Sequence, residues 1–404
     1  MSTLKVDNIR HNSATSDAIT MASDGTCTAK LTSVGGAQLS HRNKARNGEM
    51  KISQRATTFS TTTSDKYLID GWMTQHGSSG NLDCTVTQSN DAPAGFSKSL
   101  KITPDSTNTP SGSQNGMLAQ RLEGQDLQDF AFGTSDAKTI TVSWYAKTSA
   151  TGAGNYTVKV EYSPDGSQGN VYAVNKLFAF TTSWTRYTYT IPATGTATSV
   201  GIVDSNVFGF RIEYHLFSGP DDVHSQFTQW TSNSSPTYKV ISGQKNFMDN
   251  TNNELYITGL QIEVGDTATS FEHKKISDEL RDCQRYFAIF PGRSGGIPFW
   301  QGYMGSSDGY CSITVPNFNM RAVPTPTDAS TGTSTSNGNI YDVYGNNHNS
   351  RYAGNGTVTL SCNGYAPSGI GLIMDFGAHT TSTKEGVVAS WNGASPGIFL
   401  SCEL

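Results

Sequence analysis

The feature that most constrains this chain is a series of short segments in which apolar and polar residues alternate. Six of them lie at residues 99–104, 138–147, 156–162, 184–191, 209–217 and 254–264, and turn sequences such as SPDGSQG (163–169) separate them. A period of two is typical of a β-strand with one face in a core and one face in water. Successive strands without helices between them predict a two-layer antiparallel sandwich over residues 41–275.

The composition agrees with a chain of strands and turns. Only 15% of the 404 residues are charged, while glycine occurs 41 times. Long surface helices need more Glu, Lys, Arg and Ala than this, and frequent turns need glycine. The length is also too great for one ordinary core, so we expect more than one domain.

Three further pieces flank the predicted sandwich. Residues 1–40 contain an alternating segment, LKVDNI, but few large apolar residues, so we expect a β-rich segment that packs against another body. Residues 276–290 carry the one strong helix pattern, with acidic residues early, arginines later and Pro-Gly after it. Residues 291–404 return to alternation and predict a second, smaller β-sandwich.

The helix at 276–290 has an apolar stripe with steps of four and three residues, formed by Ile276, Leu280, Cys283, Phe287 and Phe290. A helix of this length is marginal alone in water, so the stripe needs a partner surface. Two partners remain open. One is the underside of the sandwich, and the other is the same helix in sister chains, which would form a short neck between the two β-domains.

Several classes of partner are disfavoured. The net charge is −5 and no basic tract occurs, which argues against nucleic acid and against a polybasic membrane patch. No apolar run is long enough to cross a membrane, and the first residues lack the apolar region of a secretory signal. The six cysteines form no C-x-x-C pair, so we expect free thiols in a reducing cytoplasm, with no zinc and no other metal or cofactor.

Candidate catalytic motifs lack their required context. GRSGG (292–296) and GSSDG (305–309) match the G-x-S-x-G pattern, but neither stands between a strand and a helix. The neighbouring acids Asp221 and Asp222, and also Asp126 and Asp129, are expected to be solvated turn residues rather than a glycan-cleaving pair. The loop DNTNNE (249–254) offers oxygen ligands, and a turn is favoured there over a structural Ca²⁺ site.

Two separated stretches resemble a jelly-roll module of bacteriophage tail fibres and other virion proteins. The opening of that module is matched by Asn47, Gly48, Met50, Ile52, Gln54, Arg55, Thr58, Phe59, Tyr67, Asp70 and Trp72. Its close resembles LQIEVGDTATSFEHKKISDELRDCQRYF (260–287). The chain departs from the pattern at Ser53, Ser270 and Phe287, where the module commonly has Trp, Pro and Tyr. The resemblance covers about residues 42–290.

The resemblance implies a jelly roll akin to carbohydrate-binding modules, in a homotrimeric fibre on a virion. MSTLKVDNI is similar to the start of virion proteins of marine podovirus-like phages, and FNMRAVPTPT (318–327) is similar to a stretch in the terminal domains of such fibres. These similarities imply that residues 1–40 attach the chain to other virion proteins. They supply no set of sugar-binding residues.

Aromatic side chains are the remaining candidates for contact with a glycan, because sugar faces stack on Trp and Tyr. Trp230 lies in a polar loop and is predicted to be an exposed platform. The other candidates all belong to the terminal domain: Trp300, Tyr303, Tyr341, Tyr344 and Trp391. Packing in a core or an interface is the alternative for each of these residues, and for Trp72 and Trp144 we expect the core.

The resemblance implies a virion protein made in the host cytoplasm, and the lack of a catalytic motif in its required context favours a non-enzymatic one. We expect a trimeric tail fibre that contacts a host surface glycan or receptor through its β-domains. Two alternatives stay open: a head fibre, decoration or tail-assembly protein without a receptor role, and a polysaccharide depolymerase.

Overall fold

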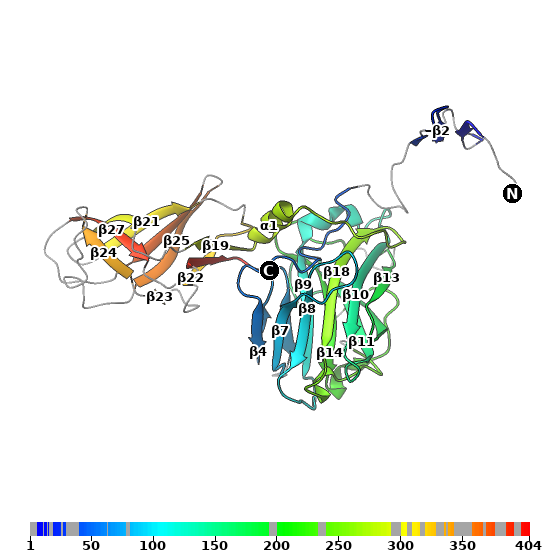
Figure 1. The fold of residues 1–404 in the computed structure, drawn as a ribbon, viewed down its shortest axis with the longest axis horizontal. Helices are drawn as coiled ribbons and strands as arrows, with labels where there is room; N and C mark the ends of the chain where they lie inside the picture. The colour runs from blue at the N-terminus through cyan, green and yellow to red at the C-terminus, as the bar shows by residue number, and fades with distance from the viewer. Residues whose placement is uncertain are drawn as a thin grey trace.

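A computed structural model gives the fold of the chain (Figure 1). It describes residues 6–10, 12–13, 15, 19–25, 27–29, 40–62, 64–77, 81–193, 200–232, 240–291, 300–304, 309–315, 320–328, 335–336, 338–342, 358–366, 369–375, 385–391 and 397–404. In these residues strands far outnumber helical turns, which confirms the predicted all-β fold.

The first sheet of the body has six strands, and every neighbouring pair is antiparallel. Its order is β13 (Thr185–Ile191), β10 (Ile140–Thr148), β18 (Leu255–Val264), β8 (Ser99–Pro104), β7 (Cys84–Ser89) and β4 (Thr58–Thr61). The strands from the start and the end of the body are thus interleaved, because β18 lies between β10 and β8. The sequence alone does not predict this strand order, because it depends on contacts between segments that lie far apart in the chain.

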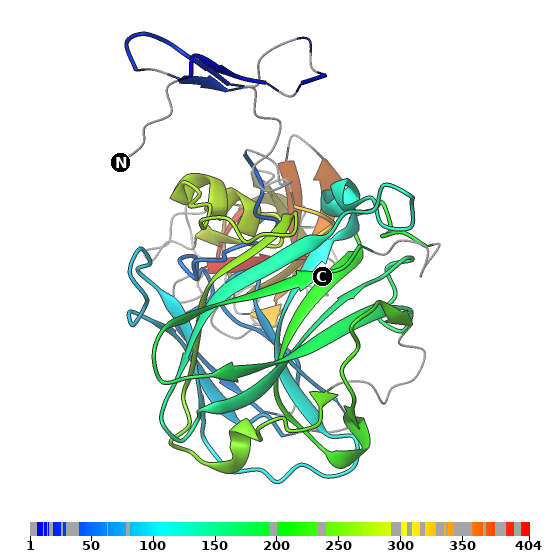
Figure 2. The same cartoon turned by 90° about the vertical axis from the view of Figure 1, so that its right-hand side faces the viewer.

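The second sheet of the body has seven strands, also antiparallel. Its order is β16 (Thr231–Ser232), β12 (Tyr172–Phe180), β11 (Gly154–Tyr162), β14 (Phe208–Ser218), β9 (Asn115–Glu123), β6 (Met73–Gly77) and β5 (Lys66–Tyr67). Figure 2 shows the two sheets face to face, which is the predicted sandwich.

The core of the body fills the space between the two sheets. Trp72 and Trp144 are both fully buried, as predicted, and the ring of Tyr214 packs against each of them. The Trp144 and Tyr214 centroids are 5.5 Å apart at a steep angle, an arrangement that aromatic pairs prefer. Alternation along β10 points Val142 and Trp144 inward, and on β18 a register shift beside Gly259 lets both Ile257 and Ile262 point inward.

Short helical turns and a small parallel pair close the ends of the body. The 3₁₀ turns are η1 (Gly124–Phe130), η3 (Pro220–Asp222) and η4 (Phe247–Asp249), and β15 (Val223–His224) pairs in parallel with β17 (Val240–Ile241). Turn η1 follows directly from β9, and its residue Asp126 lines the candidate site.

Helix α1 (Ile276–Gln284) is shorter than the predicted 276–290, because the chain turns at Arg285 and continues as strand β19 (Phe287–Pro291). Phe287 therefore lies in a strand and not on a helical stripe. The exposed fractions also break the stripe: Ile276 is 58% exposed, whereas Cys283 and Phe287 are buried. Among the helix residues it is Glu279 and Cys283 that face the body.

The terminal part of the chain forms two more sheets (Figure 1). One has the order β19, β28 (Gly397–Ser401) and β22 (Thr325–Asp328). The other has the order β23 (Thr335–Ser336), β25 (Val358–Ala366), β26 (Gly369–Asp375), β21 (Gly309–Val315), β20 (Trp300–Met304), β27 (Glu385–Trp391) and β24 (Gly338–Asp342). We call these sheets the tip, and their strands agree with the alternation in residues 291–404.

The N-terminal segment contains three short antiparallel strands, β1 (Asn8–Ile9), β2 (Ile19–Met21) and β3 (Cys27–Ala29). Within residues 6–25, no side chain that the structure describes is buried. Val6, Ile9 and Met21 are between 36% and 48% exposed. The segment is β-rich, as predicted, and the apolar side chains that the structure describes in residues 6–25 lie at its surface.

Candidate functional site: the junction around helix α1

The two stretches that carry the family resemblance meet at one place, where helix α1 lies on the body. Residues 43–48 run beside β18: the backbone N–H of Lys44 donates to the carbonyl of Ile262 at 2.9 Å, and that of Leu260 donates to Gly48 at 3.1 Å. A Cβ atom on Gly48 would lie 2.2 Å from the carbonyl oxygen of Leu260. Only glycine allows the two segments to approach so closely. We call this meeting place the junction.

Asn47 is the centre of the junction. Its backbone is left-handed, with φ of 46°, a conformation that asparagine tolerates better than most residues. The side-chain amide accepts from the N–H of Ile52 at 2.9 Å, and it donates to the carbonyl oxygens of Ile52 and Asp70 at 2.7 and 2.9 Å. The Asn47 backbone N–H donates to the carboxylate of Glu279 on α1. One buried residue thus ties two loops and the helix together.

A second bridge runs through Gln54. Its backbone and side-chain N–H groups both donate to the carboxylate of Asp70, at 2.8 and 2.6 Å. The same amide also donates to the carbonyl oxygen of Phe287, at 2.8 Å. Burial raises the pKa of Asp70, and the two hydrogen bonds from Gln54 oppose that rise. Gln54 therefore links the first loops of the body to the first strand of the tip.

A third bridge joins α1 to β9. Glu123 is fully buried, and its carboxylate accepts from Arg285 at 2.6 and 2.7 Å in a two-point pair. The hydroxyl of Tyr286 donates to the same carboxylate, and the guanidinium of Arg46 lies 3.4 Å from the centroid of the Tyr286 ring. The pKa of Tyr286 is raised, chiefly by burial. Arg285 and Tyr286, which belong to the resemblance, therefore anchor the end of the helix to the buried Glu123.

Contacts from the tip complete the junction. The guanidinium of Arg321 donates to the backbone carbonyls of Asn206, Cys402 and Glu403, at 2.7 to 2.9 Å. Arg55 pairs with Glu403, and its guanidinium lies 3.6 Å from the centroid of the Phe287 ring. The tip is thus held to the body by cations whose donors reach both sides.

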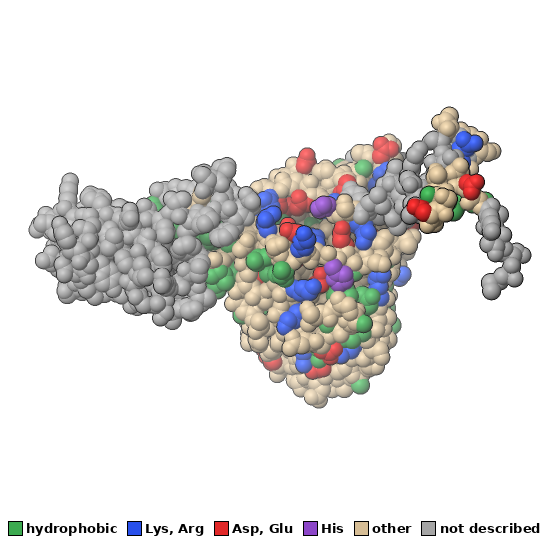
Figure 3. All heavy atoms as spheres, turned by 45° about the horizontal axis from the view of Figure 1, so that its top comes forward, with side chains coloured by type: hydrophobic (Ala, Val, Ile, Leu, Met, Phe, Trp, Pro, Cys, Tyr) green, Lys and Arg blue, Asp and Glu red, His purple; other side chains and the backbone are tan. Residues whose placement is uncertain are grey.

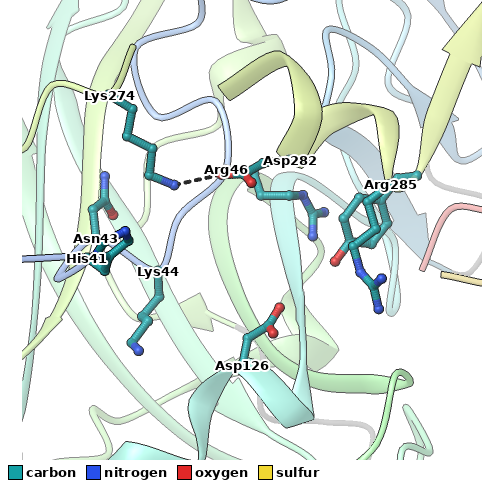
Figure 4. A pocket seen from close by; sticks show the side chains of 9 residues that line it. His41, Asn43, Lys44, Arg46, Asp126, Lys274, Asp282 and Arg285 are labelled. Atoms are coloured by element: carbon teal, nitrogen blue, oxygen red, sulfur yellow. Dashed lines mark hydrogen bonds and ion pairs between the residues drawn. The ribbon is translucent and has the colours of Figure 1, made fainter. Parts of the chain in front are cut away.

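A cleft of about 310 Å³ opens beside α1 (Figure 4). Its walls come from the 41–46 segment, η1 and the helix, and they consist of His41, Asn43, Lys44, Arg46, Asp126, Lys274, Asp282, Arg285 and Tyr286. Lys274 pairs with Asp282 at 3.0 Å across one side, and Lys44 pairs with Asp129 at 2.9 Å. Figure 3 shows side chains of both charge signs gathered on this face of the body. The cleft is polar, and ion pairs occupy most of its charged groups.

Two of the four acids considered for catalysis serve structural contacts, and the expectation of a solvated turn residue is wrong for Asp222. Asp129 pairs with Lys44, and Asp222 is buried and accepts from the side chain of Asn115 at 3.0 Å. In the loop at 249–254, the Asp249 carboxylate accepts from Lys245 and from Asn253. A bound lysine at that carboxylate competes with a cation for the same oxygens. The described residues contain no cluster of three or more His, Cys, Asp or Glu side chains that could hold a metal ion.

The prediction that Trp230 is an exposed platform for a glycan is wrong. Trp230 is only 4% exposed, its indole N–H donates to the carbonyl of Pro192 at 2.8 Å, and its ring packs on Phe132 and Tyr162. The polar residues beside it in the sequence hid this packing: Thr228, Gln229 and Ser232 are exposed, although Trp230 between them is buried. Trp230 supports the body and presents no open face.

The candidates in the tip fall on neighbouring strands. Trp300 and Tyr303 lie on β20, Trp391 on β27 and Tyr341 on β24, and these three strands are adjacent in the order β20, β27, β24. Trp300 pairs with Ala389, and Tyr341 pairs with Val388. Tyr344 and the two G-x-S-x-G sequences' central serines lie outside the described residues. Glycan contact by the tip residues remains a prediction.

Sequence reasoning missed the residues that build the junction. Arg46 and Glu123 were not singled out, because nothing in their local sequence separates a buried ion from a solvated one. The signal lay in the resemblance itself: Asn47, Gln54, Asp70 and Tyr286 all belong to the matched motifs. A helix residue such as Glu279 looks exposed in a heptad pattern, although here it is only 8% exposed.

Comparisons with known proteins give only distant likenesses. The sequence matches no family model and no curated protein. Among solved structures, the chain is similar to the enzymatically active domain of tailspike protein 4 from bacteriophage CBA120, with 12% identity over 55% of this chain and 21% of that one (TM-score 0.29). It is also similar to the CBM22-1 xylan-binding domain of Xyn10C from Paenibacillus barcinonensis, with 13% identity over 52% of this chain and 95% of that one (TM-score 0.25).

A third likeness is to the family 11 carbohydrate-binding module of the cellulosomal cellulase Lic26A-Cel5E from Clostridium thermocellum, with 9% identity over 54% of this chain and all of that module (TM-score 0.26). The chain spans about a fifth of the tailspike domain. Similarities at this level assign no function, and the fold assignment rests on the strand pairing described above.

Proposed function

We propose that this chain is a non-enzymatic virion appendage protein, most simply a trimeric tail fibre. Its N-terminal segment would bind another virion protein, and its two β-domains would contact a glycan or receptor on the host surface. Binding by three copies would raise the effective concentration of each weak site at a glycan-coated surface.

The observation that carries this proposal is the junction. Two stretches about 200 residues apart in the sequence carry the resemblance to phage fibre modules. In the fold they interlock through Asn47, Gln54 and Glu279. A chance match of two motifs would not require its residues to hydrogen-bond to each other. The residue types that define the resemblance are therefore the ones that this architecture needs to join a jelly roll to a following domain.

The N-terminal segment supports the attachment role. Val6, Ile9 and Met21 are exposed apolar residues, and the strands β1 and β2 that carry Ile9 and Met21 are too short to be stable alone. Burying those side chains against another virion protein, or against the same segment of two sister chains, would supply the missing core.

Antibody raised against the full chain and applied to virions of the phage that encodes it tests the location. Labelling at the tail, seen by electron microscopy, is the expected result. Labelling at the head would support the alternative of a head fibre or decoration protein, and particles without labelling would overturn the virion role.

Binding of the fluorescent full chain to host cells tests the receptor role. We expect saturable binding that soluble host polysaccharide competes away. Failure to bind host cells or their glycans would leave only a structural role. Release of new reducing ends from host polysaccharide would overturn the non-enzymatic assignment in favour of a depolymerase.

A further inference from the structure

A row of side chains crosses the outer face of the six-stranded sheet, one from each strand or its edge. The strand register places Lys147 beside Tyr256, Tyr256 beside Lys101, Lys101 beside Thr87 and Thr87 beside Thr58. The inward neighbours of these residues, such as Ala146, Ile257 and Leu100, are fully buried. Alternation therefore points the row to the outside. Six strands at about 4.8 Å spacing make it roughly 24 Å long.

Trp184 stands at the β13 end of the row and supplies an aromatic ring. It is partly exposed, and its indole N–H donates to the carboxylate of Asp91 at 2.9 Å. The ring of Tyr256 supports it from the side, with centroids 6.1 Å apart and the planes at 69°. Tyr256 itself is only 8% exposed, so Trp184 is the more accessible of the two rings, with the Lys147 ammonium 5.5 Å from its centroid.

Two ion pairs flank these rings and stay open to solvent. Lys147 pairs with Asp91, and its ammonium lies 4.6 Å from the Tyr256 centroid. Lys101 pairs with Glu254 and lies 5.5 Å from the same centroid on the next strand. The Tyr256 hydroxyl donates to Glu254 at 3.0 Å, which fixes the second pair. Donors and acceptors are thus held in defined places on both sides of the Tyr256 ring.

The charges in the row cancel, with two lysines against two carboxylates. A polyanion such as nucleic acid or a polyuronate needs an excess of cations, which this row does not offer. A neutral sugar needs an aromatic ring for its C–H face, carboxylates to accept from its hydroxyl groups and ammonium groups to donate to them. The row provides each of these groups around one exposed ring.

We propose that the row from Trp184 to Lys101 is a binding site for a neutral sugar chain, with one sugar stacked on Trp184 and its hydroxyl groups bonded to Asp91, Glu254 and the two lysines. This inference rests on the proposed function, and it assigns the glycan contact to the body rather than to the tip aromatics alone. The polar threonines beyond Lys101 would meet further sugars of the chain.

The carboxylates are suited to the role across a wide pH range. Hydrogen bonding to Lys147 lowers the pKa of Asp91, and hydrogen bonding to Lys101 lowers the pKa of Glu254. Both groups are therefore ionised acceptors at neutral pH.

The test uses the full chain on an array of neutral hexose and pentose oligosaccharides, with uronate- and sialate-containing oligosaccharides printed beside them. We expect Trp184→Ala to weaken binding to the neutral glycan that the wild type prefers by about tenfold or more, since a stacked ring is lost. Trp184→Phe, which keeps a ring but loses the indole N–H, should retain most of the affinity. Phe227→Ala is the matched control, because Phe227 is a partly exposed aromatic residue beside the other sheet.

Thermal unfolding of each variant shows whether the body is intact, and added neutral oligosaccharide should shift the tryptophan fluorescence of the wild type but not of Trp184→Phe. Equal binding by the wild type and a folded Trp184→Ala variant would overturn this site while leaving a glycan-binding role elsewhere. A wild type that binds only acidic glycans would also overturn it. A wild type that binds no glycan and no host cell would instead overturn the proposed function.

Discussion

At the scale of single residues, the junction depends on polar groups whose partners lie far away in the sequence. Asn47 and Glu279 are 232 residues apart, and Arg285 and Glu123 are 162 residues apart. A buried donor or acceptor that loses its partner costs about 1–3 kcal/mol, so each of these residues has to be matched. The resemblance identified Asn47 and Tyr286, but the sequence could not tell which acid each would meet.

Glu279 gives the junction a predictable pH dependence. Burial raises the pKa of its carboxyl group above the usual value. The folded chain therefore holds this proton at pH values where the unfolded chain has lost it, and the stability that Glu279 contributes is lost as the pH rises through its folded pKa. Glu279→Gln, which mimics the protonated form, should gain stability relative to the wild type as the pH rises above the ordinary pKa of a glutamate, measured by urea unfolding.

Glu254 provides the control with the opposite sign. Its pKa is lowered by Lys101, so its contribution is present at neutral pH and is lost as the pH falls through the folded pKa. Glu254→Gln should therefore lose stability relative to the wild type as the pH rises over the acidic range, by a small amount because the pair is partly exposed. A difference between Glu279→Gln and the wild type that stays constant with pH would contradict the buried environment of Glu279.

At the scale of elements, strand existence was well predicted and strand neighbours were not. Alternation located β8, β10, β11, β13, β14 and β18, because each of these strands has one face in the core. Their order in the sheets depends on contacts between distant segments, which alternation does not encode. The helix predicted at 276–290 is too long for the same reason. Phe287 and Phe290 fit its apolar stripe, but they pair with β28 and belong to strand β19.

The close approach of the 43–48 segment to β18 predicts a sharp effect of one methyl group. Gly48→Ala should destabilise the chain by about 1–3 kcal/mol in urea unfolding, because the new Cβ would force the segment away from Leu260. Gly169→Ala is the matched control, since its Cβ would meet only the Ser167 hydroxyl, at 3.6 Å. Equal stability of the two variants would show that the segment is not seated on β18.

Of the two partners expected for helix α1, the burial of Glu279 and Cys283 favours the body. Ile276→Asp should change the free energy of unfolding by no more than about 0.5 kcal/mol, because this side chain is 58% exposed and an acid suits the first turn. The mass of the full chain in light scattering should also stay the same. A fall in mass without unfolding would instead show that the helix takes part in a neck between sister chains.

At the scale of the whole molecule, the joint between body and tip is held by a few cations. Arg321 bonds to a body carbonyl at Asn206 and to two tip carbonyls, at Cys402 and Glu403. Arg321→Ala should loosen this joint, since three charge-assisted hydrogen bonds disappear together. We expect a larger radius of gyration in small-angle X-ray scattering and separate thermal transitions for the two domains.

The control for the joint is Arg281→Ala, which removes an exposed arginine from α1. It should leave both the scattering curve and the unfolding transition unchanged. Identical scattering by Arg321→Ala and the wild type would mean that Arg55, Gln54 and the continuous strand β19 hold the tip without it. The position of the predicted helix indicates a joint between the two β-domains. The residues that form the joint could not be predicted, because Arg321 lies in a stretch with no helix or strand pattern.

The interleaving of β18 between β10 and β8 also sets the order in which the chain can fold during synthesis. Strands β10 and β8 each lack one of their two neighbours until residues 255–264 have left the ribosome. The backbone N–H of Asn47 likewise lacks its partner until Glu279 has been synthesised. Loops of this length slow folding, since their closure precedes any gain from contacts. We therefore expect the six-stranded sheet to keep unpaired edges at β10 and β8 until β18 is synthesised, whereas all strands of the seven-stranded sheet lie within residues 66–232.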